Sequence, residues 1–249
     1  MIAHGSTDVG RIRANNQDAF FLSTTPVGEL PNLFIVADGM GGHLAGEVAS
    51  SQAVSAFTNH LQTQPAVPEG LLDFLIEATQ VANAHVYRQS ITHLAYKGMG
   101  TTFTALSLIG SKGYVAHLGD SRLYQLKQGS FKQITQDHSY VEALVRTGQI
   151  TLEEAQHHPQ KNLLTRVLGS DLETPVDGYL LDIQPGDWLL LCSDGLSNML
   201  SDTYISNAIQ ADNTVESIVT GLIAAANDSG GVDNITCILI KIEGEPHAA

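Results

Sequence analysis

The sequence predicts an α+β fold in which antiparallel sheets are covered by pairs of helices. Short β-rich runs follow one another over residues 100–134, and the turn signals SKG and KQG separate two of the pairs, as in an antiparallel meander. Helical patterns occur two at a time between groups of strands. A doubly wound parallel sheet would alternate single helices with strands, so that architecture is not expected.

Length and composition predict one globular domain over residues 1–243, followed by a disordered tail at 244–249. The net charge of −14 argues against nucleic acid or an anionic membrane as a partner. Apolar stretches stay well short of the roughly 18 residues of a membrane span, and the sequence does not open on a basic-then-apolar leader. We therefore expect a soluble cytoplasmic protein, and a monomer because no exposed apolar stripe is evident.

The first part of the chain predicts three strands and a helix pair. Residues 2–9 are typical of an edge strand, and residues 18–23 of the next strand. The unbroken apolar run at 33–37 predicts a strand buried on both faces. A helix is expected at about 44–61. A second helix is indicated by apolar residues at helical spacing, among them Leu71, Leu75, Ala78 and Ala82.

Residues 139–162 interrupt the strands with two short helices. Ser139 with Glu142, and Thr151 with Glu154, have the spacing of capping boxes, and Gly148 is a stop signal between them. We interpret the pair as a small lid. The later expected elements are three strands at LLTRVLG, GYLLDI and DWLLLCSD, helices at 202–210 and 215–228, and a final strand at NITCILIKI.

Carboxylates follow three of the apolar runs. Asp38 ends the run at 33–37, Asp120 ends YVAHLGD, and Asp194 ends WLLLCSD. Asp18 and Asp233 stand beside two other expected strands. Taken singly, each has a simpler explanation as a turn or cap residue. Together they predict one acidic rim, which is the environment that hard divalent cations need.

Magnesium or manganese suits such a rim better than zinc. Both prefer oxygen ligands and retain several waters, so a few Asp residues suffice. The sequence has neither the Cys-x-x-Cys nor the His-Glu-x-x-His spacing that zinc sites favour. Two such ions roughly 3.5–4 Å apart can deprotonate a bridging water and hold a phosphoryl oxygen. Arg13 is the candidate for the remaining phosphate oxygens, because a guanidinium binds them in pairs.

Six motifs in order carry a family resemblance: RANNQD from Arg13, ADGMGGH around Asp38, GMGTT from Gly98, GDSR from Gly119, SDGL from Ser193 and DNIT from Asp233. With these motifs the chain resembles the metal-dependent protein phosphatases of type 2C in their compact bacterial form. The resemblance implies a central antiparallel β-sandwich flanked by helix pairs, a four-layer αββα arrangement with a helical flap at about 139–168. It also implies hydrolysis of phosphoserine and phosphothreonine in proteins, dependent on Mn²⁺ or Mg²⁺, by in-line attack of a metal-bridging hydroxide.

The same resemblance implies a role for each motif residue. Asp38 would bridge two metals and the Gly39 carbonyl would bind the first. Asp194 and Asp233 would hold the second ion, and Asp120 with Asp194 a third. Asp18 would act through waters behind these ligands, and Arg13 would bind the phosphate.

Met40 departs from many eukaryotic relatives, which carry a His there that is proposed to protonate the leaving group. A thioether has no proton to donate. His43 is near in sequence but is as well explained by capping or packing. A metal-bound water is the remaining proton source for the leaving alkoxide.

Two other functions are weighed against the phosphatase. A catalytically inactive phosphatase-fold sensor or scaffold would typically have lost one of Asp38, Asp194 or Asp233, and all three are present. Nucleotide binding through the glycines at 39–42 is weakly supported, because the Gly-x-Gly-x-x-Gly spacing fails at Leu44. The physiological substrate is not readable from the sequence.

Overall fold

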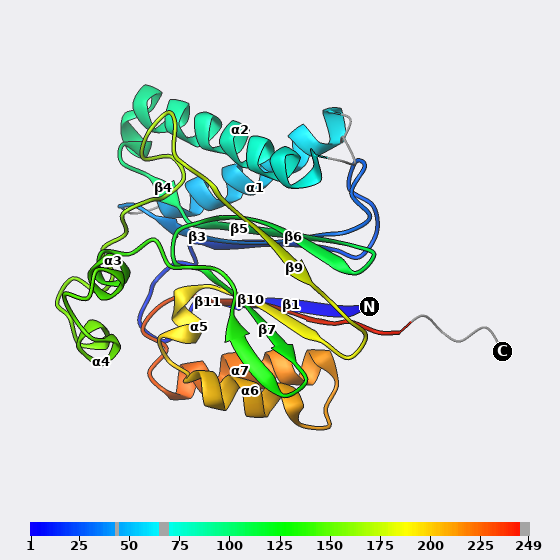
Figure 1. The fold of residues 1–249 in the computed structure, drawn as a ribbon. Helices are drawn as coiled ribbons and strands as arrows, with labels where there is room; N and C mark the ends of the chain where they lie inside the picture. The colour runs from blue at the N-terminus through cyan, green and yellow to red at the C-terminus, as the bar shows by residue number, and fades with distance from the viewer. Residues whose placement is uncertain (43–44, 65–69, 245–249) are drawn as a thin grey trace.

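The computed structural model describes residues 1–42, 45–64 and 70–244 of the chain. Two antiparallel sheets are stacked face to face and each is covered on its outer side by a pair of helices (Figure 1). The predicted α+β fold and its αββα layering are therefore confirmed. The tail expected to be disordered lies, beyond Gly244, outside the described residues.

The upper sheet in Figure 1 has the order β2-β3-β5-β6-β9, with the short β4 paired to β3. The lower sheet has the order β1-β11-β10-β7-β8. The upper strands are β2 (Asp18–Ser23), β3 (Leu33–Met40), β4 (Gly100–Thr101), β5 (Phe103–Ile109), β6 (Lys112–Leu118) and β9 (Asp177–Asp182). The lower strands are β1 (Ile2–Asp8), β7 (Arg122–Lys127), β8 (Ser130–Gln133), β10 (Trp188–Cys192) and β11 (Ile235–Lys241).

Helices cover both outer faces of the sandwich. The upper sheet carries α1 (Ala45–Thr63) and α2 (Leu71–Thr92), which leads into the short η2 (Leu94–Tyr96). The lower sheet carries α6 (Asp202–Gln210) and α7 (Val215–Asp228), after the single turn of α5 (Asp194–Ser197). Within the described ranges, no helix is long and apolar enough to cross a membrane.

Strand β3 explains why its sequence is apolar without alternation. Leu33, Ile35 and Ala37 pack into the cluster beneath α1 and α2. Phe34 and Val36 point the other way, into the core between the two sheets. Because both faces of this strand are buried, no position along it favours a polar residue until Asp38. A third apolar cluster fills the space between the lower sheet and α6 and α7, and it includes Cys192 and Cys237 as free, buried thiols.

The expected meander over residues 100–134 is divided between the sheets. Strands β5 and β6 form a hairpin in the upper sheet, whereas β7 and β8 form one in the lower sheet. Long-range partners decide this outcome, because β6 also pairs with β9 and β7 with β10. Gly119, with a φ of +103°, begins the crossing between them. The GDS segment is therefore a crossover and not a hairpin turn.

The run LLTRVLG, expected to be a strand, is an irregular connection. Its backbone makes isolated bridges, from Leu164 to Ser139 and from Leu168 to Thr101. Thr165 donates from both its backbone and its hydroxyl to the carbonyl of His138. Its backbone partners thus come from different segments, which its β-rich composition alone does not reveal.

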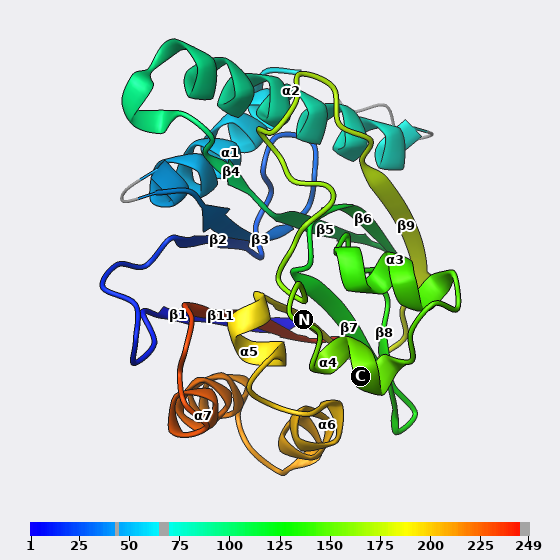
Figure 2. The same ribbon diagram turned by 90° about the vertical axis from the view of Figure 1, so that its left-hand side faces the viewer.

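The two capped helices at 139–162 are present as α3 (Tyr140–Arg146) and α4 (Leu152–Gln156). Thr151 and Glu154 form the complete capping box. Ser139 caps α3, but the Glu142 carboxylate accepts from the side chain of Gln136. Figures 1 and 2 place both helices outside the sheets, at the end of the sandwich where β3 ends and α5 begins.

Candidate active site at the end of the sandwich

Carboxylates from distant parts of the chain meet at one end of the sandwich. Strand β3 delivers Asp38, and the crossover between β6 and β7 delivers Asp120. Asp194 is the first residue of α5, and Asp233 precedes β11. These four line one cavity of about 210 Å³, together with Arg13, Gln17, Gly39, Met40, Gly41, Thr102, Asn162 and Leu164.

Asp18 lies behind this cavity and joins the two sheets. It stands directly opposite Asp38 in the register of β2 and β3. Its Oδ2 accepts hydrogen bonds from the hydroxyls of Ser193, at 2.8 Å, and Thr236, at 2.6 Å, which both belong to the lower half of the molecule. Asp18 therefore fixes the position of one sheet end relative to the other.

Gly39 permits a close approach of backbones under the cavity. A side chain there would collide with the carbonyl oxygens of Gly46 and Gln17. Gly39 N donates to that same Gln17 carbonyl at 3.1 Å. Because no other residue fits such a contact, this glycine lets the end of β3 pass close to these backbones while its own peptide lines the cavity.

The cluster is electrostatically strained in the absence of cations. Burial, and then the charges of Asp18 and Asp194, raise the pKa of Asp38 well above its usual range. Burial, and then the charge of Asp194, do the same to the pKa of Asp120. Burial raises the pKa of Asp194 to about 6, with a further contribution from Asp233. Bringing these carboxylates together is unfavourable unless positive charge is supplied.

The donor set fits hard cations that keep waters. Among the described residues, Oδ1 of Asp18 and Oδ1 of Asp194 are buried without a hydrogen-bond partner. Over residues 1–42, 45–64 and 70–244, no group of three or more His, Cys, Asp or Glu side chains is already arranged as a complete set of ligands for a metal ion. A magnesium or manganese ion would therefore take a few oxygens from this cluster and complete its shell with water, whereas a zinc site needs a tight protein shell.

Arg13 places a guanidinium at the rim. Its Nη2 donates to Asp233 Oδ2 at 2.6 Å, and its side chain is 51% exposed. The fork is thus held at the cavity by one carboxylate while much of it faces solvent. That arrangement leaves donors available to an anion entering from outside.

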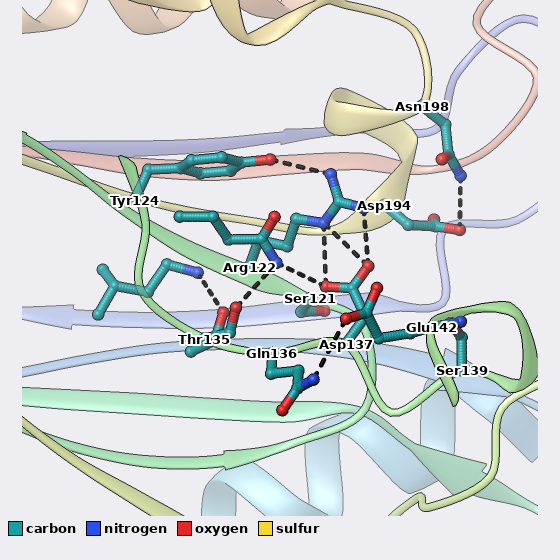
Figure 3. A network of polar contacts seen from close by, with 12 residues as sticks. Ser121, Arg122, Tyr124, Thr135, Gln136, Asp137, Ser139, Glu142, Asp194 and Asn198 are labelled. Atoms are coloured by element: carbon teal, nitrogen blue, oxygen red, sulfur yellow. Dashed lines mark hydrogen bonds and ion pairs between the residues drawn. The ribbon is translucent and has the colours of Figure 1, made fainter. Parts of the chain in front are cut away.

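Arg122 and Asp137 form a second charged cluster beside the first (Figure 3). The Arg122 Nε donates to both carboxylate oxygens of Asp137, Nη2 adds a bond of 2.7 Å, and Nη1 donates to the Tyr124 hydroxyl. Nearby, the Asn198 amide donates to Asp194 Oδ2 at 3.0 Å. Arg122 belongs to the GDSR motif, but its partners Asp137 and Tyr124 were not predicted from the sequence.

His138 is a further residue that the motifs did not single out. Its Nδ1 accepts from Gly119 N at 3.0 Å, directly before Asp120. Since an acceptor Nδ1 is unprotonated, the neutral ring carries its proton on Nε2, which donates to Asp177 Oδ2 at 3.0 Å. Arg166 binds the other oxygen of that carboxylate. This chain of contacts ties the flap to the turn that carries Asp120.

Met40 and Asn162 complete the wall. Met40 is 40% exposed at the cavity, and Asn162 enters from the segment that follows α4. His43, considered above as a proton donor, lies outside the described residues. Nothing in the apolar and acidic patterns of the sequence had indicated Asn162.

Comparison with known proteins assigns the chain to a family. The model of the protein phosphatase 2C family matches residues 11–239. The chain therefore belongs to the protein phosphatase 2C family.

Particular relatives cover nearly the whole chain. The serine/threonine phosphatase stp of Listeria monocytogenes is 38% identical over 243 residues, which are 97% of this chain and 96% of the relative. The solved structure of the S. agalactiae serine/threonine phosphatase has a TM-score of 0.90 and 36% identity, and covers 97% of this chain and 100% of its own. The catalytic domain of the phosphatase PstP, solved with two manganese ions, has a TM-score of 0.86 and 35% identity, with 98% of both chains covered.

Proposed function

We propose that this chain is a metal-dependent phosphatase that removes phosphate from serine and threonine side chains of proteins. The observation that carries the proposal is the meeting of Asp38, Asp120, Asp194 and Asp233 on one cavity with Arg13 at its rim. The family membership and the printed names of the relatives support the same reaction. The catalytic domain would span residues 1–243, with the flap at about 139–168.

Each carboxylate has a proposed place around the cations. Asp38 and the carbonyl of Gly39 would hold the first of two core ions, and Asp38 would reach the second as well. Asp194 and Asp233 would complete the second ion. The manganese pair in the PstP structure supports two core ions. A third ion, held by Asp120 with Asp194, is part of the proposal, as is manganese or magnesium as the metal.

When bound, such ions lower the pKa of a water and neutralise phosphoryl oxygens. The remaining steps belong to the protein. The exposed side of the Arg13 guanidinium would bind two oxygens of the phosphoryl group and orient it in the cavity. Asp18, held by Ser193 and Thr236, would keep the ends of both sheets, and so the facing carboxylates, at fixed separation. Met40 carries no proton to donate, so it takes no part in protonating the leaving group.

Turnover of phosphopeptides by metal-stripped protein tests this function. Phosphoserine, phosphothreonine and phosphotyrosine peptides of one sequence should be assayed with and without added Mn²⁺. We expect release of phosphate from the first two, dependent on the ion. Absence of turnover from all three with Mn²⁺ present would overturn the proposal and favour an inactive module of the same fold.

A further inference from the structure

A large apolar hollow adjoins the acidic cavity. It measures about 790 Å³, and its walls come from the last turns of α2, from η2, from residues 97–100 and from the end of the flap at 167–170. Met40 lines both the hollow and the acidic cavity. Its partner in the β3–β4 register is Gly100, which also lines the hollow. The two spaces therefore adjoin at Met40.

The hollow differs in chemistry from the rest of this acidic surface. Ile91 is 63% exposed and Leu94 is 89% exposed, although both are large apolar side chains. Among the described residues that line the hollow there is no Asp or Glu, whereas Lys97 and His93 are present. The chain as a whole has 26 acidic residues against 12 Lys and Arg. A gathering of exposed apolar side chains without acids is the surface expected of a binding site.

The position of the hollow decides what occupies it. A protein substrate must place its phosphorylated side chain in the acidic cavity, and a backbone that also reaches the hollow passes Met40, which lines both spaces. An extended segment advances about 3.3 Å per residue, so side chains a few positions away reach the neighbouring space. Two copies of this chain, each of net charge −14, repel one another, which disfavours a second copy as the occupant.

We propose that the hollow bounded by Met40, Ile91 and Leu94 is a docking subsite for one apolar side chain of the phosphoprotein substrate, within about three residues of the phosphorylated position. The inference rests on the proposed function and adds a substrate preference to it. Met40 then forms the shared wall, and its flexible thioether adapts to different apolar side chains. Lys97 at the rim would favour substrates with an acidic residue beyond the apolar one.

Paired phosphothreonine peptides test the subsite. Leucine and alanine versions should be compared at each of the positions within about three residues of the phosphothreonine, on both sides. At one or two positions we expect leucine to raise kcat/KM by about 10-fold over alanine, mostly through a lower KM, because the contact is made equally in the bound and transition states. Leu94→Asp should bring this leucine-to-alanine ratio to about 1, since the charge opposes burial of an apolar group.

The ratio is internal to each variant, so it does not depend on the amount of folded protein. Ile91→Asp, in the last turn of α2, is a second variant with the same expected loss of preference. Tyr204→Asp is the matched control, because Tyr204 is 49% exposed on α6 across the molecule and an acid in the first turn of that helix is tolerated. It should keep the leucine preference of the unchanged protein.

Three results would overturn the subsite. Equal turnover of leucine and alanine peptides at every position would show that the hollow does not read the substrate. An undiminished preference in both Leu94→Asp and Ile91→Asp would place the preference elsewhere. A dimer that Leu94→Asp dissociates would make the hollow an interface between copies. Failure of the proposed function is distinguishable, because then no phosphopeptide is turned over at all.

Discussion

Two charged clusters lie side by side at the same end of the sandwich, and they differ in how far positive charge offsets negative charge. In the cluster of Arg122 and Asp137, a fork of hydrogen bonds joins opposite charges, and the Tyr124 hydroxyl accepts from the remaining side of the guanidinium. In the acidic cavity, four carboxylates line one space. Among the described residues that line it, Arg13 is the cationic side chain, and it is paired with Asp233. The first cluster is complete within the protein. The second is unfavourable until something from outside binds.

This contrast distinguishes charges that stabilise the fold from charges that serve function. Buried ions that are already paired hold elements together, whereas buried like charges are retained at a cost in stability, which is typical of a binding or catalytic site. Variants of the two clusters should therefore act in opposite ways. Changes in the acidic cavity should remove activity and spare or raise stability, and changes in the paired cluster should lower stability first.

The largest effect is expected from Asp38→Asn. Loss of the central carboxylate should reduce turnover of para-nitrophenyl phosphate with Mn²⁺ by about 1,000-fold or more, because the charge that assembles the cations is gone. In metal-free buffer the same variant should melt about 3 °C or more above the unchanged protein, since a repulsion is relieved. Near-normal turnover, or a lower melting temperature in chelator, would break the comparison.

Arg122→Met should lower the free energy of unfolding by about 2–3 kcal/mol, because Asp137 loses its cationic partner. The loss should be smaller than for a fully buried pair, because both side chains retain some solvent contact. Urea denaturation in chelator measures it. The double variant Arg122→Met with Asp137→Leu is the matched control and should recover part of the loss. A single variant as stable as the unchanged protein would mean that the pair is not structural.

The pH dependence of metal-free stability sharpens the comparison. Burial raises the pKa of both Asp18 and Asp194 to about 6, from an ordinary value of 3.8. A carboxyl whose pKa is raised on folding favours the folded state while protonated, and this contribution is lost as pH rises from about 4 through about 6. In chelator the melting temperature should thus fall over that window. Added Mn²⁺ should oppose the fall increasingly towards neutral pH, and a flat profile in chelator would contradict the account.

Arg13→Ala is expected to have the smallest of these effects. We expect KM for para-nitrophenyl phosphate to rise about 10-fold with kcat less affected. The reason is that the guanidinium binds phosphoryl oxygens in the bound substrate as well as in the transition state. Arg13→Lys should fall between, keeping the charge and losing the fork. An unchanged KM in Arg13→Ala would remove Arg13 from the phosphate site.

Much of this arrangement could be predicted from the sequence, and the failures have physical causes. The run before Asp38 predicted a strand buried on both faces, and Leu33 and Phe34 do pack on opposite sides of β3. The division of the meander was missed because pairing of β6 with β9 and of β7 with β10 joins segments far apart in sequence. Local turn signals carry no information about such partners.

The candidate site shows the same limit. Acids after apolar runs predicted that Asp38, Asp120 and Asp194 would share one strand end, and they line one cavity. The contacts of His138 with Gly119 and Asp177 were not predictable, because they depend on the crossover and on the irregular segment after α4. The apolar hollow was likewise not predictable, since Met40 and Leu94 come to line one space only through the pairing of β3 with β4 and the placement of η2 after α2.

Calorimetric titration of the metal-stripped protein with Mn²⁺ tests the central claim most directly. The uncompensated carboxylates predict binding of roughly two equivalents or more by the unchanged protein, and loss of most of that binding in Asp38→Asn. Equal binding by both proteins, or no binding by either, would contradict the account.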